Sequence, residues 1–299
     1  MTSHCIGVDL MGGETPPQEL FQAVLEAARQ LGPSSSFVVF ATEPVLFSLP
    51  SSLPQIRFHS ISEVITMGDS PLEAIRHKKK SSLIIGLKLL KKRVIHAFVS
   101  TGNTGALIAA SSLILHRQPG IKWAALLAEV PTLGGITAVL DVGGSVLCKA
   151  DHLVQFAHLG IEYMRKVHRL DHPRVGLLNI GIESKKGTRE HQLAYQMLQG
   201  EHFVGNIEGK EVFQGKVDIL VTDGFTGNVL LKSVEGLSAF MMKHLSQQGI
   251  EAPQLQKKFD PEEYSGALIV GVKGVVVKCH GSSTPRGLFK GICAAARFI

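Results

Sequence analysis

The chain has 299 residues, of which 44% are hydrophobic and 19% are charged, and its formal net charge is +6. This composition excludes a disordered chain and is enough for the core of one large α/β domain or two smaller ones. The basic balance favours an anionic partner, which includes phosphate compounds, acidic proteins, nucleic acid and lipid headgroups, and it does not choose among them.

Elements alternate along the chain. The hydrophobic pattern predicts strands at 6–9, 37–41, 95–100, 123–130, 136–141, 175–180, 217–222 and 275–280, with helices at 16–31, from 70, at 150–167 and from 228. The segment Ser70-Pro71-Leu72-Glu73 places a capping hydroxyl before a proline at the first helical position and a glutamate three residues after the cap. Polar joints lie near 48–54 and 247–253. This alternation predicts an α/β fold with a parallel sheet.

The cysteines and the apolar segments indicate in which compartment the protein is expected. The chain has four cysteines, Cys5, Cys148, Cys279 and Cys293. They form neither a Cys-x-x-Cys pair nor a zinc-type spacing with histidine. We therefore expect reduced thiols and no metal in a cytoplasmic protein. The N-terminus lacks the pattern of a secretory signal. The uncharged stretch 97–115 contains a polar loop near its start, which favours a buried strand, loop and helix over a membrane span.

Five apolar runs end in a short loop that contains glycine and carries Asp, Asn, Ser or Thr. The loops lie at 7–13, 100–105, 140–144, 178–181 and 222–228. Because the carboxyl ends of parallel strands share one edge of a sheet, we expect the loops to converge on one crevice. Backbone N–H groups at a helix N-terminus suit a phosphate or a carboxylate, whereas ordinary turn chemistry would explain any single loop. The five together favour an anion site.

Sequence fingerprints narrow the chemistry of that crevice. The motifs G-x-G-x-x-G, G-x-x-x-x-G-K-[ST], H-E-x-x-H and G-x-S-x-G are all absent. Their absence removes the simplest dinucleotide, triphosphate, metalloprotease and serine-hydrolase interpretations. Polar groups at or after the strand ends offer donors for an anion and a candidate acid or base: Asn179, Glu183, Lys185, Lys186, Asp223, Asn228, Lys232 and His280.

The segment from Arg76 to Arg93 contains eight Lys or Arg residues and no acid. One explanation is a solvated helix face. The other is a docking surface for an acidic partner beside the 100–105 loop. Nucleic acid is the weaker partner, because only 6% of residues are aromatic and no recognised binding module is present.

Seven motifs, in order from Val8 to Ser283, resemble the bacterial acyl-ACP:phosphate acyltransferases of phospholipid synthesis. They are Val8-Asp9-x-Met11-Gly12-Gly13, Met67-Gly68-Asp69-Ser70-Pro71-x-x-Ala74-Ile75-Arg76, Ser100-x-Gly102-Asn103-Thr104-Gly105-Ala106, Gly176-Leu177-Leu178-Asn179-Ile180-Gly181, Gly205-Asn206-Ile207-Glu208-Gly209, Asp223-Gly224-Phe225-x-Gly227-Asn228-Val229-x-Leu231-Lys232 and His280-Gly281-Ser282-Ser283. The resemblance covers nearly the whole chain.

The resemblance implies a three-layer α/β/α Rossmann-like fold, related to the phosphotransacetylases and the isocitrate and isopropylmalate dehydrogenases, in one domain over residues 1–299. It implies a homodimeric acyltransferase that moves a long acyl chain from acyl carrier protein (ACP) to inorganic phosphate without a cofactor. The acyl phosphate would feed a membrane glycerol-3-phosphate acyltransferase in phospholipid synthesis. We accordingly expect a cytoplasmic enzyme that does not bind nucleic acid.

Site residues follow from the resemblance and from loop position. We expect Lys186, Asn228 and His280 to act in catalysis. We expect phosphate or substrate to be bound by Asp9, Gly12, Gly13, Gly102, Asn103, Thr104, Gly105, Asn179, Asp223, Gly224 and Lys232. Because acyl carrier proteins are acidic, Arg76, Lys78, Lys79 and Lys80 are candidates for docking ACP.

Three segments depart from the pattern of the resembling family. Gly143-Gly144-Ser145 replaces Gly-Ala-Asn, Lys122-Trp123 replaces Arg-Pro, and Tyr264-Ser265-Gly266-Ala267-Leu268 replaces Tyr-Gly-Gly-Ala-Pro. A lysine keeps the charge of an arginine but loses its bidentate fork. The departures bear on chain-length preference and turnover more than on the reaction.

The helix from Asn228 carries apolar residues with interspersed Lys232, Lys243 and His244, which suits core or dimer packing. The resemblance also implies peripheral membrane contact through this region at the inner face of the cell membrane. Alternative functions remain: a short-chain phosphate acyltransferase that uses coenzyme A thioesters, or a non-catalytic ACP-binding module. A nicotinamide dehydrogenase is disfavoured by the missing fingerprint.

Overall fold

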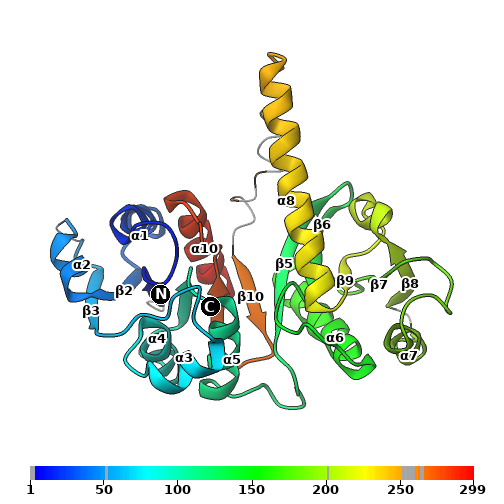
Figure 1. Cartoon of the computed structure of the whole chain (residues 1–299), viewed down its shortest axis with the longest axis horizontal. Coiled ribbons are helices and arrows are strands. Elements are labelled where there is room, and N and C mark those ends of the chain that lie inside the picture. Colours follow the sequence, from blue (N-terminus) through cyan, green and yellow to red (C-terminus); the bar gives the residue numbers. More distant parts are fainter. Residues whose placement is uncertain are drawn as a thin grey trace. The chain divides into compact units, whose positions relative to one another are not determined.

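The computed structural model describes residues 4–50, 53–200, 202–250, 253, 260, 262 and 266–299 (Figure 1). The chain divides into two compact units, unit 1 with Met1–Ala124 and Ser265–Ile299, and unit 2 with Ala125–Tyr264. Each unit has its own hydrogen-bonded strands and is described by itself. The single domain expected over residues 1–299 stays a prediction, since two compact units can form one functional domain.

Unit 1 alternates strands and helices. Its elements are β1 (His4–Asp9), α1 (Pro17–Leu31), β2 (Ser35–Thr42), α2 (Glu43–Ser48), β3 (Ile56–Ile61), α3 (Pro71–His77), α4 (Ser82–Lys91), β4 (Ala97–Ser100), α5 (Thr104–Ile114), β10 (Ala267–Val270), β11 (Val275–Lys278) and α10 (Pro285–Phe298). The strand order is β3-β2-β1-β4-β11-β10, and all of these pairs are parallel except β10 with β11. The carboxyl ends of β1, β4 and β11 therefore lie at one edge.

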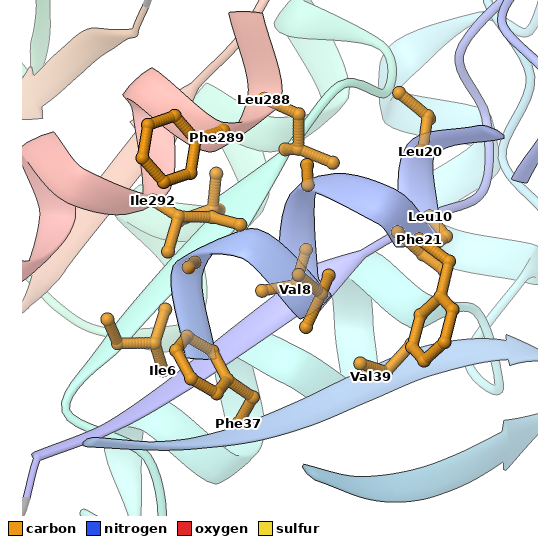
Figure 2. Packing of buried hydrophobic residues seen from close by; sticks show 14 of the residues in the cluster. Ile6, Val8, Leu10, Leu20, Phe21, Phe37, Val39, Leu288, Phe289 and Ile292 are labelled. Atoms are coloured by element: carbon orange, nitrogen blue, oxygen red, sulfur yellow. The ribbon is translucent and has the colours of Figure 1, made fainter. Parts of the chain in front are cut away.

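One face of the unit 1 sheet is covered by α1 and α10 (Figure 2). Ile6 and Val8 of β1, and Leu10 directly after the strand, are buried against them together with Phe21 of α1 and Leu288 of α10. Full burial of each such large side chain contributes about 1.5–3 kcal/mol. The helix α10 begins where Thr284 accepts a hydrogen bond from the backbone amide of Gly287, with Pro285 at the first helical position.

The other face of the same sheet carries α4. Gly7 of β1 and Gly86 of α4 both lie against Phe98 of β4, and a Cβ atom on Gly86 would come 2.1 Å from Phe98 Cε2. The absent side chain lets the helix approach the strand closely. The residues of β1 that point to this face are Cys5, Gly7 and Asp9, so Asp9 is held between the sheet and a helix rather than in solvent.

Unit 2 contains β5 (Ala125–Thr132), β6 (Gly135–Leu140), α6 (Ala150–His168), β7 (Val175–Asn179), α7 (Arg189–Met197), β8 (Phe203–Glu208), the 3-10 helix η1 (Gly209–Gln214), β9 (Ile219–Val221) and α8 (Gly224–Gln247). Its strand order is β5-β6-β9-β7-β8. Strands β6, β9, β7 and β8 are parallel, whereas β5 runs antiparallel to β6. The expected parallel sheet is thus present from β6 to β8, while β5 runs antiparallel because residues 133–134 form a tight connection that returns the chain directly.

Helix α8 has few neighbours over its later half. Its N-terminal part packs on β6, with Leu230, Leu231 and Val234 lining a small apolar hollow, whereas its C-terminal half extends away from the rest of unit 2 (Figure 1). In the part of the chain that the structure describes, none of the helices combines the length and the apolar character that crossing a membrane requires.

Candidate active site

Asp9 organises the loop edge of unit 1. Its Oδ1 accepts a hydrogen bond from the Met11 amide at 2.9 Å, and its Oδ2 accepts one from Ser100 Oγ at 2.8 Å. Ser100 Oγ in turn accepts from the Gly102 amide at 3.0 Å. The carboxyl group thus braces the loops that follow β1 and β4.

Burial raises the pKa of Asp9 to about 6. The hydrogen bonds from Met11, Ser82 and Ser100 and the positive charge of Lys278 act in the opposite direction, because each stabilises the carboxylate. Close to neutral pH the group is therefore ionised, and it takes up a proton in mildly acidic solution.

After β1, two positions must be glycine because neighbouring atoms leave no room for a side chain. Gly12 has φ of 83°, and a Cβ atom there would lie 2.5 Å from the carbonyl oxygen of Ile65. A Cβ atom on Gly13 would lie 2.6 Å from Thr101 Oγ1 and 3.0 Å from the Gly281 carbonyl oxygen. The predicted site glycines therefore let the loops after β1, β4 and β11 come together.

Buried hydroxyl groups lie where these three loops meet. Thr101 Oγ1 and Ser283 Oγ are buried and accept or donate no hydrogen bond among the described residues. Nearby, the ammonium group of Lys278 donates to the carbonyl oxygens of Thr101, at 3.3 Å, and of Cys279. A buried cation with unused hydroxyls is a setting that suits an oxyanion.

Asn103 is a brace in this structure. Its Oδ1 accepts from the Ala106 amide and caps α5, and its Nδ2 donates to the carbonyl oxygens of Thr66, Met67 and Asp69 at 3.1–3.2 Å. Both polar atoms are thus occupied. A direct contact between Asn103 and phosphate stays a prediction, whereas its role in holding segment 66–69 is observed.

The other predicted residues of unit 1 lie around the same edge. Gly102 is buried against Ser100, Thr104 begins α5, and Gly105 allows Pro71 of α3 to approach. His280 is exposed after β11, with Nδ1 3.4 Å from Ser282 Oγ. Its position agrees with an acid or base at the loop edge, and that role stays a prediction.

The basic segment divides into bound and exposed residues. Lys78 Nζ contacts Asp69 Oδ2 at 2.5 Å and the Val64 carbonyl oxygen at 2.8 Å, so it stabilises the segment before α3. Arg76, Lys79 and Lys80 are exposed. The helix start at Pro71 is confirmed, but the Ser70 hydroxyl makes no capping hydrogen bond.

In unit 2, Asp141 shapes the loop after β6. Its Oδ1 accepts from the amides of Leu126, Gly143 and Gly144, and its Oδ2 accepts from the Ser145 amide at 2.6 Å. Burial raises the pKa of this carboxyl, and the backbone donors lower it. The same loop packs on the N-terminus of α8, where the Gly224 amide donates to the Ser145 carbonyl oxygen.

The start of α8 carries three predicted residues. Asp223 caps the helix, accepting from the Thr226 amide and hydroxyl at 2.8 Å each. A Cβ atom on Gly224 would lie 2.9 Å from Asp141 Oδ2, so this glycine permits the close packing. Asn228 is exposed on the first turns, and its Oδ1 lies 3.9 Å from where a Cβ atom of Gly143 would be.

The loop after β7 is tied down by asparagines. Asn179 Nδ2 donates to the Lys186 carbonyl oxygen at 3.1 Å, and Asn206 Nδ2 donates to that of Glu183 at 2.8 Å. The side chain of Lys186 is left exposed on the loop. Lys232, in contrast, pairs with Glu235 at 2.7 Å on α8. Substrate contacts of Asn179, Lys186 and Lys232 stay predictions.

Lys278, Asp141, Thr101 and His191 were not among the predicted site residues. Lys278 sits within an apolar strand pattern, which gave no signal of a charged group at the loop edge. Burial lowers the pKa of His191, against the opposing charge of Asp223, and its Nδ1 lies 2.8 Å from Thr188 Oγ1. Among the described residues, no three His, Cys, Asp or Glu side chains are arranged to hold a metal ion.

Comparison with solved structures defines the class of fold. The chain is similar to a branched-chain phosphotransacylase from Enterococcus faecalis V583, with a TM-score of 0.67, 17% identity and 98% of each chain covered. It is also similar to 4-hydroxythreonine-4-phosphate dehydrogenase from Klebsiella pneumoniae, with a TM-score of 0.62, 11% identity and coverage of 98% and 99%. The expected α/β fold, related to phosphotransacetylases and to a dehydrogenase, is confirmed.

Sequence comparison identifies the family. The sequence model of the family described as "Fatty acid synthesis protein" matches residues 4–299. A phosphate acyltransferase of Methylococcus capsulatus is 41% identical over 300 residues, covering 93% of this chain and 88% of the relative. One of Thermoanaerobacter pseudethanolicus is 38% identical over 312 residues, covering 98% and 93%. The chain belongs to this family, and the resemblance to phosphate acyltransferases and the expectation of an acyltransferase enzyme are confirmed.

Proposed function

We propose that the enzyme transfers an acyl group from the thioester of ACP to inorganic phosphate, reversibly, and so supplies acyl phosphate for phospholipid synthesis. The observation that carries the proposal is the edge of unit 1, where the Lys278 ammonium and the unused hydroxyls of Thr101 and Ser283 are buried beside glycine loops. Such preorganised donors favour an oxyanion over a neutral ligand. Phosphate as substrate is further supported by the names of the relatives.

The reaction needs little beyond positioning. A phosphate oxygen attacks the thioester carbonyl carbon, the carbonyl π electrons move to oxygen, and the tetrahedral oxyanion collapses. The carbon–sulfur bond breaks and the thiolate of the ACP prosthetic group takes up a proton. Donors fixed around the oxyanion lower the barrier, and His280, Lys186 and Asn228 are the proposed groups for proton transfer and oxyanion contact.

The exposed members of the basic segment are proposed to dock the acidic ACP. Replacing Arg76, Lys79 and Lys80 by Glu removes three exposed positive charges and adds three negative ones, while leaving the Lys78 to Asp69 ion pair intact. We expect KM for acyl-ACP to rise roughly tenfold or more with kcat little changed, because surface charge acts mainly on association.

A matched control for this experiment is Lys273→Glu, at an exposed position between β10 and β11. The control is expected to keep the KM of the wild-type enzyme, and higher salt should raise the wild-type KM towards that of the triple variant. An equal rise in KM for the control, or none for the triple variant, counts against docking at this surface.

The proposed setting is a cytoplasmic homodimer that contacts the inner face of the membrane peripherally. Exposed apolar side chains on α8, among them Phe225, Leu237 and Phe240, support an interface through this helix. Peripheral contact would let acyl phosphate pass to a membrane-bound glycerol-3-phosphate acyltransferase. Flotation with anionic liposomes tests the contact, and the absence of salt-sensitive binding would speak against it.

Choice of acyl donor tests the proposal against its alternatives. Phosphate-dependent turnover of palmitoyl-ACP supports it. Turnover of acetyl- or butyryl-coenzyme A without turnover of acyl-ACP would identify a short-chain enzyme. Tight ACP binding without turnover would identify a non-catalytic module. Ala at Asn228 or Lys186 is expected to slow acyl phosphate formation with the fold intact, and normal rates in both variants would remove these residues from the mechanism.

A further inference from the structure

Three buried polar residues form one row across the unit 1 sheet. Asp9 of β1 pairs with Ser100 of β4, and Ser100 pairs with Lys278 of β11. Residues in register on neighbouring strands point to the same face. Their exposed fractions are 2%, 0% and 7%, so a carboxyl, a hydroxyl and an ammonium group lie side by side out of water.

Each member of the row is connected to a loop at the candidate site. Asp9 accepts from the Met11 amide, Ser100 accepts from the Gly102 amide, and Lys278 donates to the carbonyl oxygens of Thr101 and Cys279. The Ser100 hydroxyl also donates to Asp9 Oδ2. The shapes of the loops after β1, β4 and β11 therefore depend on this one set of polar contacts.

The two ionisable groups in the row carry opposite charges. A buried ammonium or carboxylate is costly unless an opposite charge or hydrogen bonds stabilise it. The groups that act on the Asp9 carboxyl from the elements around it are the Ser82 hydroxyl of α4, the Ser100 hydroxyl of β4, the Met11 amide and the Lys278 charge of β11. All four favour the carboxylate against the effect of burial; the Met11 amide contributes most, and the electrostatic contribution of Lys278 is the smallest of the four.

We propose that Lys278 is a positioning residue for the transfer reaction: its ammonium group keeps Asp9 as a carboxylate, and that carboxylate holds the loops after β1 and β4 in the conformation that receives phosphate. This inference rests on the proposed function for its catalytic consequence. The effect of Lys278 on the Asp9 carboxyl can be measured without any activity, because both residues lie in the same row of the unit 1 sheet.

The coupling is tested by titrating the Asp9 carboxyl. Aspartate carboxyls are labelled with ¹³C, the Asp9 resonance is assigned by its loss in Asp9→Asn, and its midpoint is followed by NMR in wild type, Lys278→Met and Lys278→Arg. Since an opposite charge favours the ionised form of a carboxyl, the midpoint should rise in Lys278→Met and stay near wild type in Lys278→Arg. Lys273→Met, at an exposed position, is the control.

The catalytic consequence has its own readout. The acid limb of the pH profile for phosphate-dependent transfer should move to higher pH in Lys278→Met, with activity returning towards wild type in alkaline solution and in Lys278→Arg. A loss of packing alone would lower the rate at every pH. Lys278→Gln keeps a donor for the two carbonyl oxygens and replaces Lys278→Met if circular dichroism shows that the Met variant does not fold.

The outcomes distinguish a failure of the Lys278–Asp9 inference from a failure of the proposed transfer reaction. An unchanged Asp9 midpoint in a folded, neutral Lys278 variant overturns the inference. A raised midpoint with an unshifted pH profile also overturns it, since Asp9 would then titrate without affecting transfer. If wild type shows no phosphate-dependent transfer, the proposed function fails, and the NMR titration still decides whether Lys278 and Asp9 are coupled.

Discussion

At the scale of single residues, polar side chains at the candidate site mainly hold loops. Asn103, Asn179 and Asn206 each donate to backbone carbonyl oxygens, and Asp141 accepts from four backbone amides. Such contacts satisfy buried backbone groups that would otherwise destabilise the fold. The loops are thereby fixed before substrate binds, which is what a reaction that depends on positioning requires.

Asp9 gives a prediction about stability and pH. Its pKa is raised from 3.8 to about 6, so the folded protein binds a proton there more tightly than the unfolded chain does. The contribution of this group to the free energy of unfolding is therefore highest below pH 4. It falls by about 3 kcal/mol as the pH rises to about 6. Asp9→Asn should lack this fall, as measured by urea unfolding at a series of pH values.

The control for the Asp9 experiment is Asp69→Asn. Lys78 holds the pKa of Asp69 below its usual value, so its contribution has the opposite sign: it is present above the unfolded-state pKa and is lost as the solution is acidified. The two variants should therefore change the pH dependence in opposite directions. If the free energy of unfolding depended on pH in the same way in Asp9→Asn and in wild type, the raised pKa of the buried Asp9 carboxyl would be contradicted.

Asn103 gives a second prediction at this scale. Asn103→Ala removes both the cap of α5 and the three contacts to segment 66–69, and should lower stability by about 2 kcal/mol. Asn103→Asp keeps the capping oxygen but cannot donate to the carbonyl oxygens, so it should restore only part of the loss. Limited proteolysis within 66–69 should increase in both variants. Unchanged protection of that segment would contradict the role of Asn103 in holding it.

At the scale of elements, the sequence was most informative where pattern and local chemistry agree. The boundaries of α1, α6 and β1 follow the predicted ranges within two residues, because long amphipathic runs and end signals define them. Three strands were missed. β3 contains exposed polar residues between its two buried ends. In β8, Gly205 and Asn206 interrupt the apolar residues, and β10 is only four residues long.

Helix packing gives a paired prediction. A Cβ atom on Gly86 of α4 would overlap Phe98, whereas one on Gly236 of α8 has nothing within 4 Å. Gly86→Ala should therefore destabilise by about 1–3 kcal/mol through overpacking. Gly236→Ala should stabilise α8 by about 0.5–1 kcal/mol, because alanine loses less backbone entropy in a helix. Equal effects in thermal unfolding would contradict the close approach of α4.

At the scale of the whole molecule, the loops that the sequence singled out lie at the carboxyl ends of β1 and β4 in unit 1 and of β6, β7 and β9 in unit 2. Loop position was predictable because parallel strands share an edge. The antiparallel direction of β5 was missed because the short connection 133–134 was not recognised as a hairpin turn. The division into two units was missed because it depends on contacts between segments far apart in the sequence. Lys278 was missed for the same reason: its charge is matched by Asp9, 269 residues earlier.

The proposed dimer would form through an exposed apolar face of α8. Leu237, Phe240 and Met241 share one exposed face of α8 by their i, i+3, i+4 spacing. Replacing Leu237 and Phe240 by Glu should convert a dimer to monomers in analytical ultracentrifugation, while Lys243→Glu, at an exposed position of the same helix, should leave it dimeric. A wild-type monomer, or a dimer that tolerates the double change, would exclude this interface.

The central claim is that the chain makes acyl phosphate from acyl-ACP. The most direct measurement incubates the purified protein with palmitoyl-ACP, with and without inorganic phosphate, and follows both free ACP and acyl phosphate trapped by hydroxylamine. Both products are expected to form together and only when phosphate is present. Release of ACP at the same rate without phosphate, or no release despite ACP binding, would contradict this claim.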